Sequence, residues 1–349
     1  MCRHFSFLYR YMDKKQKHTN KHFKLAILML GANANICDDL TFFNEYEMAK
    51  ETWANNLPKD IALIYYDGGK YMKNEFIDEG DNHYILHLAC EDDMKWTYKK
   101  TWLAYTYIYN NFDVDWFFRT NTSTYVNIDL LQTLIKKDII DASDVYCSDI
   151  YSLSEACCPY PLCLYPRGNG ILMSNGLVYS TFIRDGMRYS YLGICDDIVI
   201  GNMVNSYFMS NGLNYVDHIK GLPHGWYKTV DTKFNNRHKL CCFGEDNQDP
   251  KFWSNFVTIQ YKKYRDRGKE KKQFYELHDI MKQKESVDLD VIKHYMDNYS
   301  IFIGSILGYI DFETWVNFDK NELYLLEISH KACDDEQYYK YEEIQGKNL

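Results

Sequence analysis

Hydrophobic and polar positions alternate along the chain in blocks that predict buried strands and amphipathic helices in turn. Residues 25–30 and 61–66 are short, continuous apolar runs followed closely by glycine, which is typical of strands buried on both faces of a sheet. Between these runs, apolar residues recur at helical spacing and predict a helix that ends before Pro58. The residues on its apolar face are Phe42, Tyr46, Ala49 and Trp53.

The same alternation continues further along the chain. The predicted elements are a strand at 84–88, a helix near 92–110 with Trp96, Leu103 and Tyr107 on one face, a strand at 116–120, a helix around 130–135 and a strand near 144–148. Repeated strand–helix units predict an α/β fold with a mostly parallel sheet flanked by helices. Because ligands of such sheets bind at the carboxyl ends of the strands, we expect the chemistry just after strands.

Both ends of the chain differ in character from this α/β core. Residues 1–24 are polar and basic and predict a flexible tail, whereas residues 25–235 carry the α/β pattern. Residues 236–349 predict a mainly helical extension, with an amphipathic helix at 286–299 whose stripe is Val291, Ile292, Tyr295 and Tyr299, and a further strand at 322–329. The charged run 262–272 is either a solvated helix face or a contact for an acidic membrane surface.

Composition excludes several classes of protein. The 349 residues are 46% hydrophobic and 26% charged, as in a folded globular protein, and the net charge of −9 disfavours a nucleic-acid binder. The longest apolar runs, 25–32 and 301–310, are far shorter than the roughly 20 residues of a membrane span. Residues 1–11 lack the features of a signal peptide, so we expect a cytoplasmic protein without a membrane span.

The cysteines support the same expectation. Eleven cysteines occur, an odd number, and none forms a CxxC pair, so a zinc site is not expected. In a protein without an export signal, cysteines are expected to be reduced, buried thiols. The sequence also contains no glycine-rich phosphate loop of the GxGxxG or GxxxxGK type.

The segment with the most chemical information is DWFFRTNTSTYVN, residues 115–127, in which a buried strand runs into a polar turn and then a helix. It resembles the signature of the fringe and β-1,3-galactosyltransferase family, which has an aromatic strand, a basic residue, Thr, three Asp, Thr or Ser, an aromatic residue, Val and Asn. The matching residues are Arg119, Thr120, Thr124, Tyr125, Val126 and Asn127. The three family aspartates fall on Asn121, Thr122 and Ser123.

Four further segments resemble family landmarks, in the family's order. Residues 51–53 resemble its Glu-Thr-Trp helix after the first strand, and residues 91–101 resemble its acidic stretch followed by Thr-x-Lys, with Lys99 on the lysine. Gly168, Gly170 and Ser174 match its Gly-x-Gly-aromatic-x-x-Ser stretch, and the segment DDIVIG at 196–201 resembles its Glu-Asp-Val-x-x-Gly. The resemblance covers about residues 25–225.

This resemblance implies a GT-A-like fold and an inverting glycosyltransferase. The expected donor is a nucleotide-sugar, with a uridine diphosphate hexose preferred, and the expected acceptor is a hydroxyl of a glycan or glycoprotein. Asp197 falls on the family's base position and would take the acceptor proton. Since Asp197 also begins a predicted helix, the alternative is a capping role alone, and Asp196 is expected to cap the helix or to support Asp197.

The other site residues follow from the same resemblance and from their chemistry. The residues expected at the donor are Arg119, Asn121, Thr122, Ser123, Lys99, Asp196 and His224, and those expected at the acceptor are Gly168, Asn169 and Gly170. Arg119 could face the diphosphate, or it could form an ion pair with Asp115 or Asp144. His224 could instead be an ordinary loop histidine and the two glycines could belong to a plain turn, while Asp92 and Asp93 are expected to start a helix.

Metal dependence is the main point at which the chain departs from the family. Mg²⁺ and Mn²⁺ select charged oxygen ligands, and Asn121, Thr122 and Ser123 offer only neutral groups. We therefore expect no metal cofactor, with Mn²⁺ or Mg²⁺ held by other residues as the alternative. Fixed cations such as Arg119, Arg167, Lys228, Lys233 or Arg237 could stabilise the diphosphate instead. Two rival functions are a non-catalytic glycan-binding or assembly module and a GT-A enzyme that retains stereochemistry.

Overall fold

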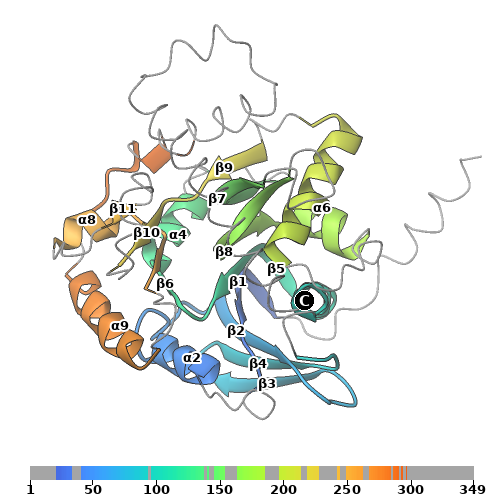
Figure 1. The fold of residues 1–349 in the computed structure, drawn as a ribbon, viewed down its shortest axis with the longest axis horizontal. Coiled ribbons are helices and arrows are strands. Elements are labelled where there is room, and N and C mark those ends of the chain that lie inside the picture. Colours follow the sequence, from blue (N-terminus) through green and yellow to red (C-terminus); the bar gives the residue numbers. More distant parts are fainter. Residues whose placement is uncertain are drawn as a thin grey trace, which may run out of the picture.

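The computed structural model describes residues 21–33, 41–92, 96–136, 140, 145–153, 163–184, 196–213, 218–227, 242–243, 249–261, 267–283, 286–290, 292–293 and 296. Its central feature is an eight-stranded sheet (Figure 1). The strands of this sheet are β1 (His22–Leu30), β2 (Ile61–Gly68), β3 (Glu75–Gly80), β4 (His83–Leu88), β5 (Asp113–Asn121), β7 (Tyr146–Leu153), β8 (Cys163–Ser174) and β9 (Ile219–Gly221).

The strand order is β3-β4-β2-β1-β5-β8-β7-β9. The four central strands β4, β2, β1 and β5 are parallel to one another, and β9 is parallel to β7, whereas β3 and β8 run antiparallel to their neighbours. The expected α/β fold with a mostly parallel sheet is therefore confirmed. The apolar runs predicted at 25–30 and 61–66 are the cores of β1 and β2, and β1 starts slightly earlier than the run, at His22.

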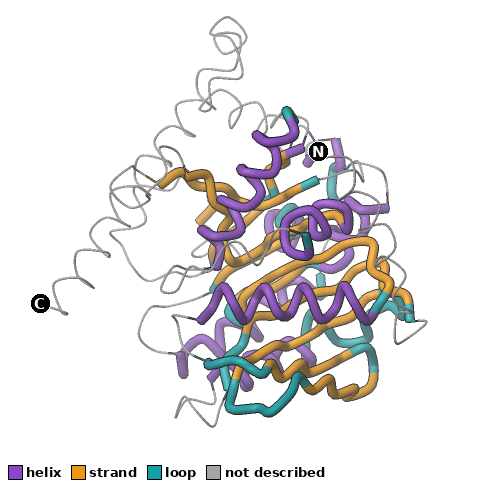
Figure 2. The backbone as a smooth tube through the Cα atoms, turned by 90° about the vertical axis from the view of Figure 1, so that its right-hand side faces the viewer, coloured by secondary structure: helices purple, strands orange, loops and turns teal. Residues whose placement is uncertain are grey.

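Helices cover both faces of the sheet, as Figures 1 and 2 show. Alternate residues of β1 point into two separate cores, because successive side chains of a strand face opposite ways. Ile27 packs in one core with residues of α2 (Thr41–Glu51), α4 (Ile128–Lys136) and α9 (Arg267–Met281). Leu28 packs in the other core with residues of α3 (Thr97–Asn111) and α6 (Asp196–Asn211). The apolar stripe expected on α2 is confirmed for Tyr46 and Ala49, which are buried.

The order of the strands creates a switch point beside β1. The chain leaves β1 through α2 to reach β2 on one side, and it later returns through α3 to place β5 on the other side of β1. In sheets of this kind, a crevice opens at the carboxyl ends of the two strands where the direction of winding reverses. The fold therefore points to the ends of β1 and β5 as the place for a ligand.

A second, smaller sheet lies next to the turn at the end of β5, residues 121–123, which we call the motif turn. Its order is β11-β10-β12-β6, and its strands are β6 (Thr124–Val126), β10 (His224–Trp226), β11 (Cys242–Phe243) and β12 (Thr258–Gln260). β12 pairs antiparallel with β6, so residues from the C-terminal region are joined directly to the turn. Phe274 and Leu277 of α9 enter the same core as α2, and the short helix α8 (Pro250–Ser254) contacts α9.

The C-terminal region thus differs in part from the predicted helical extension. Its described residues contain the strands β11 and β12 as well as α8 and α9. Ile292 of the predicted 286–299 stripe is buried, but Val291, Tyr295, Tyr299 and the strand predicted at 322–329 lie outside the described residues. Lys271 and Lys272 of the charged run are exposed on α9, which fits a solvated helix face.

Two strands of the large sheet, β3 and β8, were missed by the apolar pattern. β3 is an exposed, acidic edge strand, so it carries no apolar run. β8 contains a proline and two glycines, which are uncommon inside strands. The short strand β9 contains only three residues, Ile219–Gly221, and residues 214–217 before it lie outside the described part. The short helix α5 (Asn175–Val178) and the π-helix η2 (Tyr179–Ile183) follow β8.

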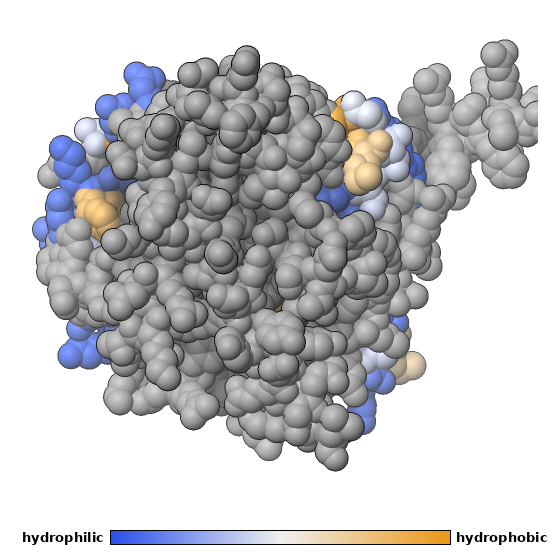
Figure 3. Space-filling model, turned by 45° about the horizontal axis from the view of Figure 1, so that its top comes forward, coloured by the Kyte–Doolittle hydropathy of each residue, from blue (hydrophilic) through white to orange (hydrophobic). Residues whose placement is uncertain are grey.

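On the face shown in Figure 3, the described residues that are visible are mainly hydrophilic, with a few apolar residues among them. Among the described residues, the exposed large hydrophobic side chains are Met72 in the loop between β2 and β3, Ile77 on β3 and Met209 on α6. Within the described residues, no helix has both the length and the apolar character needed to span a bilayer.

Candidate active site

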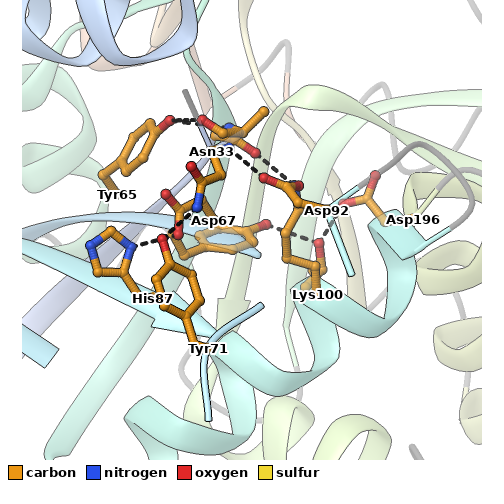
Figure 4. A network of polar contacts seen from close by, with 12 residues as sticks. Asn33, Tyr65, Asp67, Tyr71, His87, Asp92, Lys100 and Asp196 are labelled. Atoms are coloured by element: carbon orange, nitrogen blue, oxygen red, sulfur yellow. Dashed lines mark hydrogen bonds and ion pairs between the residues drawn. The ribbon is translucent and has the colours of Figure 1, made fainter. Parts of the chain in front are cut away.

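Polar side chains gather at one edge of the large sheet, where β1, β2, β4 and β5 end. Two groups of contacts can be distinguished there. One surrounds Arg119 at the end of β5, and the other surrounds Asp67 and Asp92 at the ends of β2 and β4. Figure 4 shows the second group together with Asp196 from the first. Both groups lie beside the switch point between β1 and β5.

Arg119 connects three of the motif segments. Its Nη2 atom lies 2.7 Å from Oδ2 of Asp196, and its Nη1 atom donates to Oδ1 of Asn121 over 2.9 Å and to the carbonyl oxygen of Gly168. The Arg119 residue is only 2% exposed. The guanidinium is therefore held by protein groups and has almost no surface left for a diphosphate.

Of the two alternatives for Arg119, a contact with the diphosphate or an ion pair, the structure shows an ion pair. Its partner is Asp196 and not one of the two expected aspartates. Asp115 instead lies 3.1 Å from Nε2 of His22, and Asp144 lies outside the described residues. Sequence spacing could not identify Asp196 as the partner, because α6 meets β5 only through the tertiary fold.

Gly168 is required by this contact. A Cβ atom on Gly168 would lie 2.3 Å from Nη1 of Arg119, which is closer than real Cβ contacts allow. A Cβ atom on Gly170 would lie 2.8 Å from Cγ2 of Thr258. Both glycines thus permit close packing of β8 against its neighbours. Their expected role at an acceptor remains a prediction.

Asp196 receives a second contact, from α3. The hydroxyl of Thr101 donates to Oδ2 of Asp196 over 2.9 Å, and the hydroxyl of Tyr66 lies 2.9 Å from that of Thr101. Asp196 is 3% exposed, and burial raises the pKa of Tyr66 and keeps this phenol neutral. The start of α6 is therefore fixed by contacts with β5 and α3.

Asp197 follows directly and is partly exposed. Its Oδ1 atom accepts a hydrogen bond from the backbone N–H of Ile198 over 2.9 Å. Burial, together with the negative charge of Asp196, raises the pKa of Asp197 to about 7, and the positive charge of Arg119 opposes this rise. A carboxylate with such a pKa can accept a proton near neutral pH, and the contact with Ile198 is also compatible with the capping role.

The motif turn after β5 is anchored from two sides. The hydroxyl of Thr122 donates to the carboxylate of Glu45 on α2, and the hydroxyl of Tyr261 donates to the carbonyl oxygen of Thr122 over 3.0 Å. Thr122 is 3% exposed, and Ser123 is also buried. Asn121 is half-buried and presents its Oδ1 to Arg119. Of the three replaced positions, Asn121 is therefore the most accessible to a ligand.

Sequence reasoning missed Glu45, although a signal was present. Glu45 lies three residues after Phe42 and four before Ala49, so it falls on the apolar face of α2. Glu45 is only 4% exposed on this face, so its carboxylate needs a polar partner, which Thr122 supplies. A charged residue inside an apolar stripe is the pattern that could have identified it.

His224 is a buried, neutral histidine that joins the two sheets. Its Nε2 atom lies 2.7 Å from Nδ2 of Asn169 on β8, and its Nδ1 atom lies 3.1 Å from the carbonyl oxygen of Thr258 on β12. Burial lowers its pKa well below the ordinary value, and nearby Arg167 adds to this effect. The geometry fits an imidazole that donates from Nδ1 and accepts at Nε2.

Lys100 is the buried lysine of α3, and it lies next to the residue that the motif comparison selected. Its Nζ atom lies 2.5 Å from Oδ1 of Asp92 and 2.7 Å from the carbonyl oxygen of Gly31, at the end of β1 (Figure 4). The backbone N–H of Asn33 donates to the other oxygen of Asp92. Lys99 is exposed, with Nζ 4.6 Å from the centroid of the Trp96 ring.

The buried face of α3 explains the difference between the two lysines. The face carries Thr97, Thr101, Ala104, Tyr105 and Ile108, and Lys100 falls within it. The predicted stripe of Trp96, Leu103 and Tyr107 is only half-buried. Asp92, expected to start the helix, lies before it and forms the buried ion pair with Lys100, and Asp93 lies outside the described residues.

A histidine–aspartate pair lies at the ends of β2 and β4. Nδ1 of His87 lies 2.7 Å from Oδ1 of Asp67, and the Tyr71 ring stacks on the imidazole at 4.7 Å between centroids. The Asn33 side chain donates to the Tyr71 hydroxyl over 2.5 Å. The hydrogen bond to Asp67 raises the pKa of His87, and burial raises the pKa of Asp67 despite the histidine.

The described residues offer no cluster of three or more His, Cys, Asp or Glu side chains suited to a metal ion. Of the other cations considered for the diphosphate, Arg167 is half-buried on β8, and Lys228, Lys233 and Arg237 lie outside the described part. The two cysteines whose state the structure describes, Cys90 and Cys147, are buried free thiols.

Comparisons with known proteins give a likeness of fold only. No protein-family model matches the chain, and no curated protein matches it. Among solved structures, it is similar to the galactosyltransferase LgtC in complex with donor and acceptor sugar analogues, with 10% identity over 75% of this chain and 97% of that one and a TM-score of 0.39. An active-site mutant of LgtC gives 10% identity, the same coverage and a TM-score of 0.40.

A third solved structure, that of a putative glucose-1-phosphate thymidylyltransferase from Bacillus anthracis in complex with sucrose, has 9% identity over 57% of this chain and 87% of that one, with a TM-score of 0.32. Likenesses at this level say nothing about which reaction a chain performs.

Proposed function

We propose that the chain is an inverting glycosyltransferase that moves a hexose from a nucleotide-sugar to a hydroxyl of a glycan or glycoprotein. The observation that carries this proposal is the set of contacts around Arg119. Three segments that resemble separate family landmarks, represented by Asn121, Gly168 and Asp196, contact one guanidinium at the end of β5. Thr101 adds a fourth such segment through its hydrogen bond to Asp196.

The position of these contacts supports a ligand site. They lie beside the switch point between β1 and β5, where sheets of this class bind nucleotides. A structural cluster elsewhere in the fold would not need to coincide with that edge. The convergence of the motif residues and the switch point therefore favours a role in binding or transfer.

In the proposed reaction, Asp197 acts as the base. Its carboxylate takes the proton from the acceptor hydroxyl while the hydroxyl oxygen forms a bond to the anomeric carbon of the sugar. The bond between that carbon and the diphosphate oxygen breaks, and the nucleoside diphosphate leaves with its electron pair. Partial exposure and a pKa raised to about 7 suit Asp197 to this role.

The network at the ends of β1, β2 and β4 is the proposed site of the nucleoside. Tyr71 is half-exposed and offers an aromatic face, and the segment at Asn33 is held in place by Asp92 and Lys100. Aromatic faces and fixed amide groups are suited to bind a base and a ribose. The hexose would then extend towards Asn121 and Asp197.

The residues at the motif turn do not fit a Mg²⁺ or Mn²⁺ ion. Asn121 and Ser123 are neutral, and the Thr122 hydroxyl is committed to Glu45. Because Oδ1 of Asn121 accepts from Arg119, its amide N–H groups are the part that can meet a ligand. An amide N–H can donate directly to a phosphate oxygen, which a carboxylate cannot do.

The second candidate is a non-catalytic glycan-binding or assembly module. The observation that favours it is that Thr122 and Ser123 are buried, so two of the three motif positions are withdrawn from a ligand. Both proposals use the same site, and they differ in whether a bound sugar is transferred. Calorimetric titration of the chain with uridine diphosphate hexoses tests whether the site binds a donor at all, and an absence of binding would contradict the transferase proposal.

A further inference from the structure

The charged groups around Asp197 come from several elements. Asp196 precedes it on α6, and Arg119 approaches from β5. Tyr66 of β2 and Tyr105 of α3 also face the Arg119–Asp196 pair, and burial raises the pKa of both phenols, so they remain neutral. Arg119 and Asp196 are therefore the charges that dominate the surroundings of Asp197.

Arg119 and Asp196 cannot themselves contact a substrate to any useful extent. They are 2% and 3% exposed, and the two Nη atoms of Arg119 and Oδ2 of Asp196 bind Asn121, Gly168, Thr101 and each other. Any influence on a transfer reaction must act through a neighbour. The neighbour with partial exposure and a titratable group is Asp197.

From this geometry we infer that the Arg119–Asp196 ion pair is the positioning device of Asp197, because it holds the start of α6 against the end of β5. The inference rests on the proposed function for its catalytic meaning. Arg119 fixes the first residue of α6 to the end of β5 and thereby sets where Asp197, the next residue, lies relative to that strand end. Arg119 and Asp196 are accordingly positioning residues.

The two partners of the ion pair change the pKa of Asp197 in opposite directions. The negative charge of Asp196 makes ionisation of Asp197 less favourable, and the positive charge of Arg119 makes it more favourable. Removing one charge should therefore move the titration of Asp197 in the direction opposite to removing the other. Opposite shifts would show that both charges act on Asp197, and the Arg119→Lys variant described below separates this effect from positioning.

The test is a ¹³C NMR titration of the Asp197 carboxyl in the full chain, with Asp197 assigned by comparison with Asp197→Asn. Asp196→Asn should lower the midpoint of Asp197, and Arg119→Gln should raise it, each by about one pH unit. The double variant should return the midpoint towards the parent value. Circular dichroism and thermal unfolding of each variant establish that it is folded.

Arg119→Lys separates charge from geometry. Lysine keeps the positive charge but cannot bind Asn121, Gly168 and Asp196 at once, because it lacks the planar fork of donors. We expect the midpoint of Asp197 to stay within a few tenths of a pH unit, while kcat falls roughly 10-fold or more through misplacement. A large loss of kcat with an unchanged midpoint is the signature of positioning.

The outcomes distinguish this inference from the proposed function. Equal shifts in the same direction for Asp196→Asn and Arg119→Gln, or no shift in either, would overturn the inference even if the chain is a transferase. Opposite shifts in a chain that turns over no nucleotide-sugar would support the electrostatic coupling and contradict the proposed function.

Discussion

Nη2 of Arg119 lies 2.7 Å from Oδ2 of Asp196, and both side chains are almost completely buried. The pair joins the end of β5 to the start of α6, two elements from distant parts of the chain. Breaking a buried ion pair by removing one partner typically costs about 3–5 kcal/mol, because the other charge is left without compensation. The Asp197 carboxylate is thus carried on a helix whose first residue is firmly fixed.

Asp197→Asn should lower the rate of sugar transfer by roughly 100-fold or more, because the amide cannot take the acceptor proton. The affinity for the nucleotide-sugar should stay within a few-fold, since Asn keeps the shape of the side chain. Rates of released nucleoside diphosphate and calorimetric affinities check the two parts. Asp129→Asn, an exposed aspartate in the first turn of α4, is the matched control and should retain activity. Equal transfer by Asp197→Asn and the parent would remove Asp197 from the mechanism.

The raised pKa of Asp197 also predicts how the stability of the fold depends on pH. The unfolded carboxyl titrates near 4 and the folded one at about 7, so between these values the folded chain binds a proton that the unfolded chain has lost. Stability contributed by this group must then fall as the pH rises from about 4 to about 7.

Asp197→Asn removes this dependence. Because Asp197 is partly exposed, we expect a modest gain of about 1 kcal/mol, or about 2–4 °C in Tm, above pH 7 and no gain near pH 4. Thermal unfolding at both pH values measures it. A lower Tm for Asp197→Asn at pH 8 would instead indicate that the contact of Asp197 with Ile198 dominates.

Lys100 and Lys99 form a matched pair of positions on α3. Lys100→Met should destabilise the fold by about 3–5 kcal/mol, because it leaves the buried Asp92 carboxylate without its partner. Lys99→Met should change stability by about 1 kcal/mol or less, because Lys99 is exposed and its Nζ lies over the Trp96 ring. Urea unfolding gives both values. Similar losses for the two variants would contradict the placement of Lys100.

The fold was predictable where the hydrophobic pattern of a segment is enough to define its helix or strand. Apolar runs identified β1 and β2 because both strands are buried on two faces, and the helical period identified α2. β3 and β8 were missed because an exposed edge strand has no apolar run and because β8 contains Pro166, Gly168 and Gly170. Their places in the sheet depend on pairing with β4 and β5, which local sequence does not encode.

The sequence identified the segments that form the site, but it did not predict the contacts between them. The motif comparison selected Arg119, Asn121, Gly168 and Asp196 separately, and the structure brings them into contact. The motif comparison placed Arg119 at a diphosphate, whereas in the structure the guanidinium is buried and paired with Asp196. The motif comparison selected Lys99, which is exposed, whereas the adjacent Lys100 is buried, because one residue along a helix changes the direction of a side chain by about 100°. The role of Lys99 at the donor stays a prediction.

Asn121 offers the sharpest test of how the diphosphate is bound. Asn121→Asp introduces a carboxylate where the amide N–H is proposed to donate, and it should weaken donor binding roughly 10-fold in the presence of EDTA through charge repulsion. Asn121→Ser is the control, since it removes the amide without adding charge and should weaken binding less. Calorimetry with a uridine diphosphate hexose measures both. Tighter binding by Asn121→Asp without metal would contradict the proposed contact.

The central claim is that this chain transfers a sugar from a nucleotide-sugar without needing a divalent metal. The most direct measurement incubates the chain with a panel of nucleotide-sugars and glycan acceptors, with and without EDTA, and quantifies the released nucleoside diphosphate together with the glycosylated product. We expect acceptor-dependent release that survives EDTA and is lost in Asp197→Asn. Release that EDTA abolishes and Mn²⁺ restores would contradict the metal-independent mechanism, and the absence of both turnover and binding under every condition would contradict the transferase function itself.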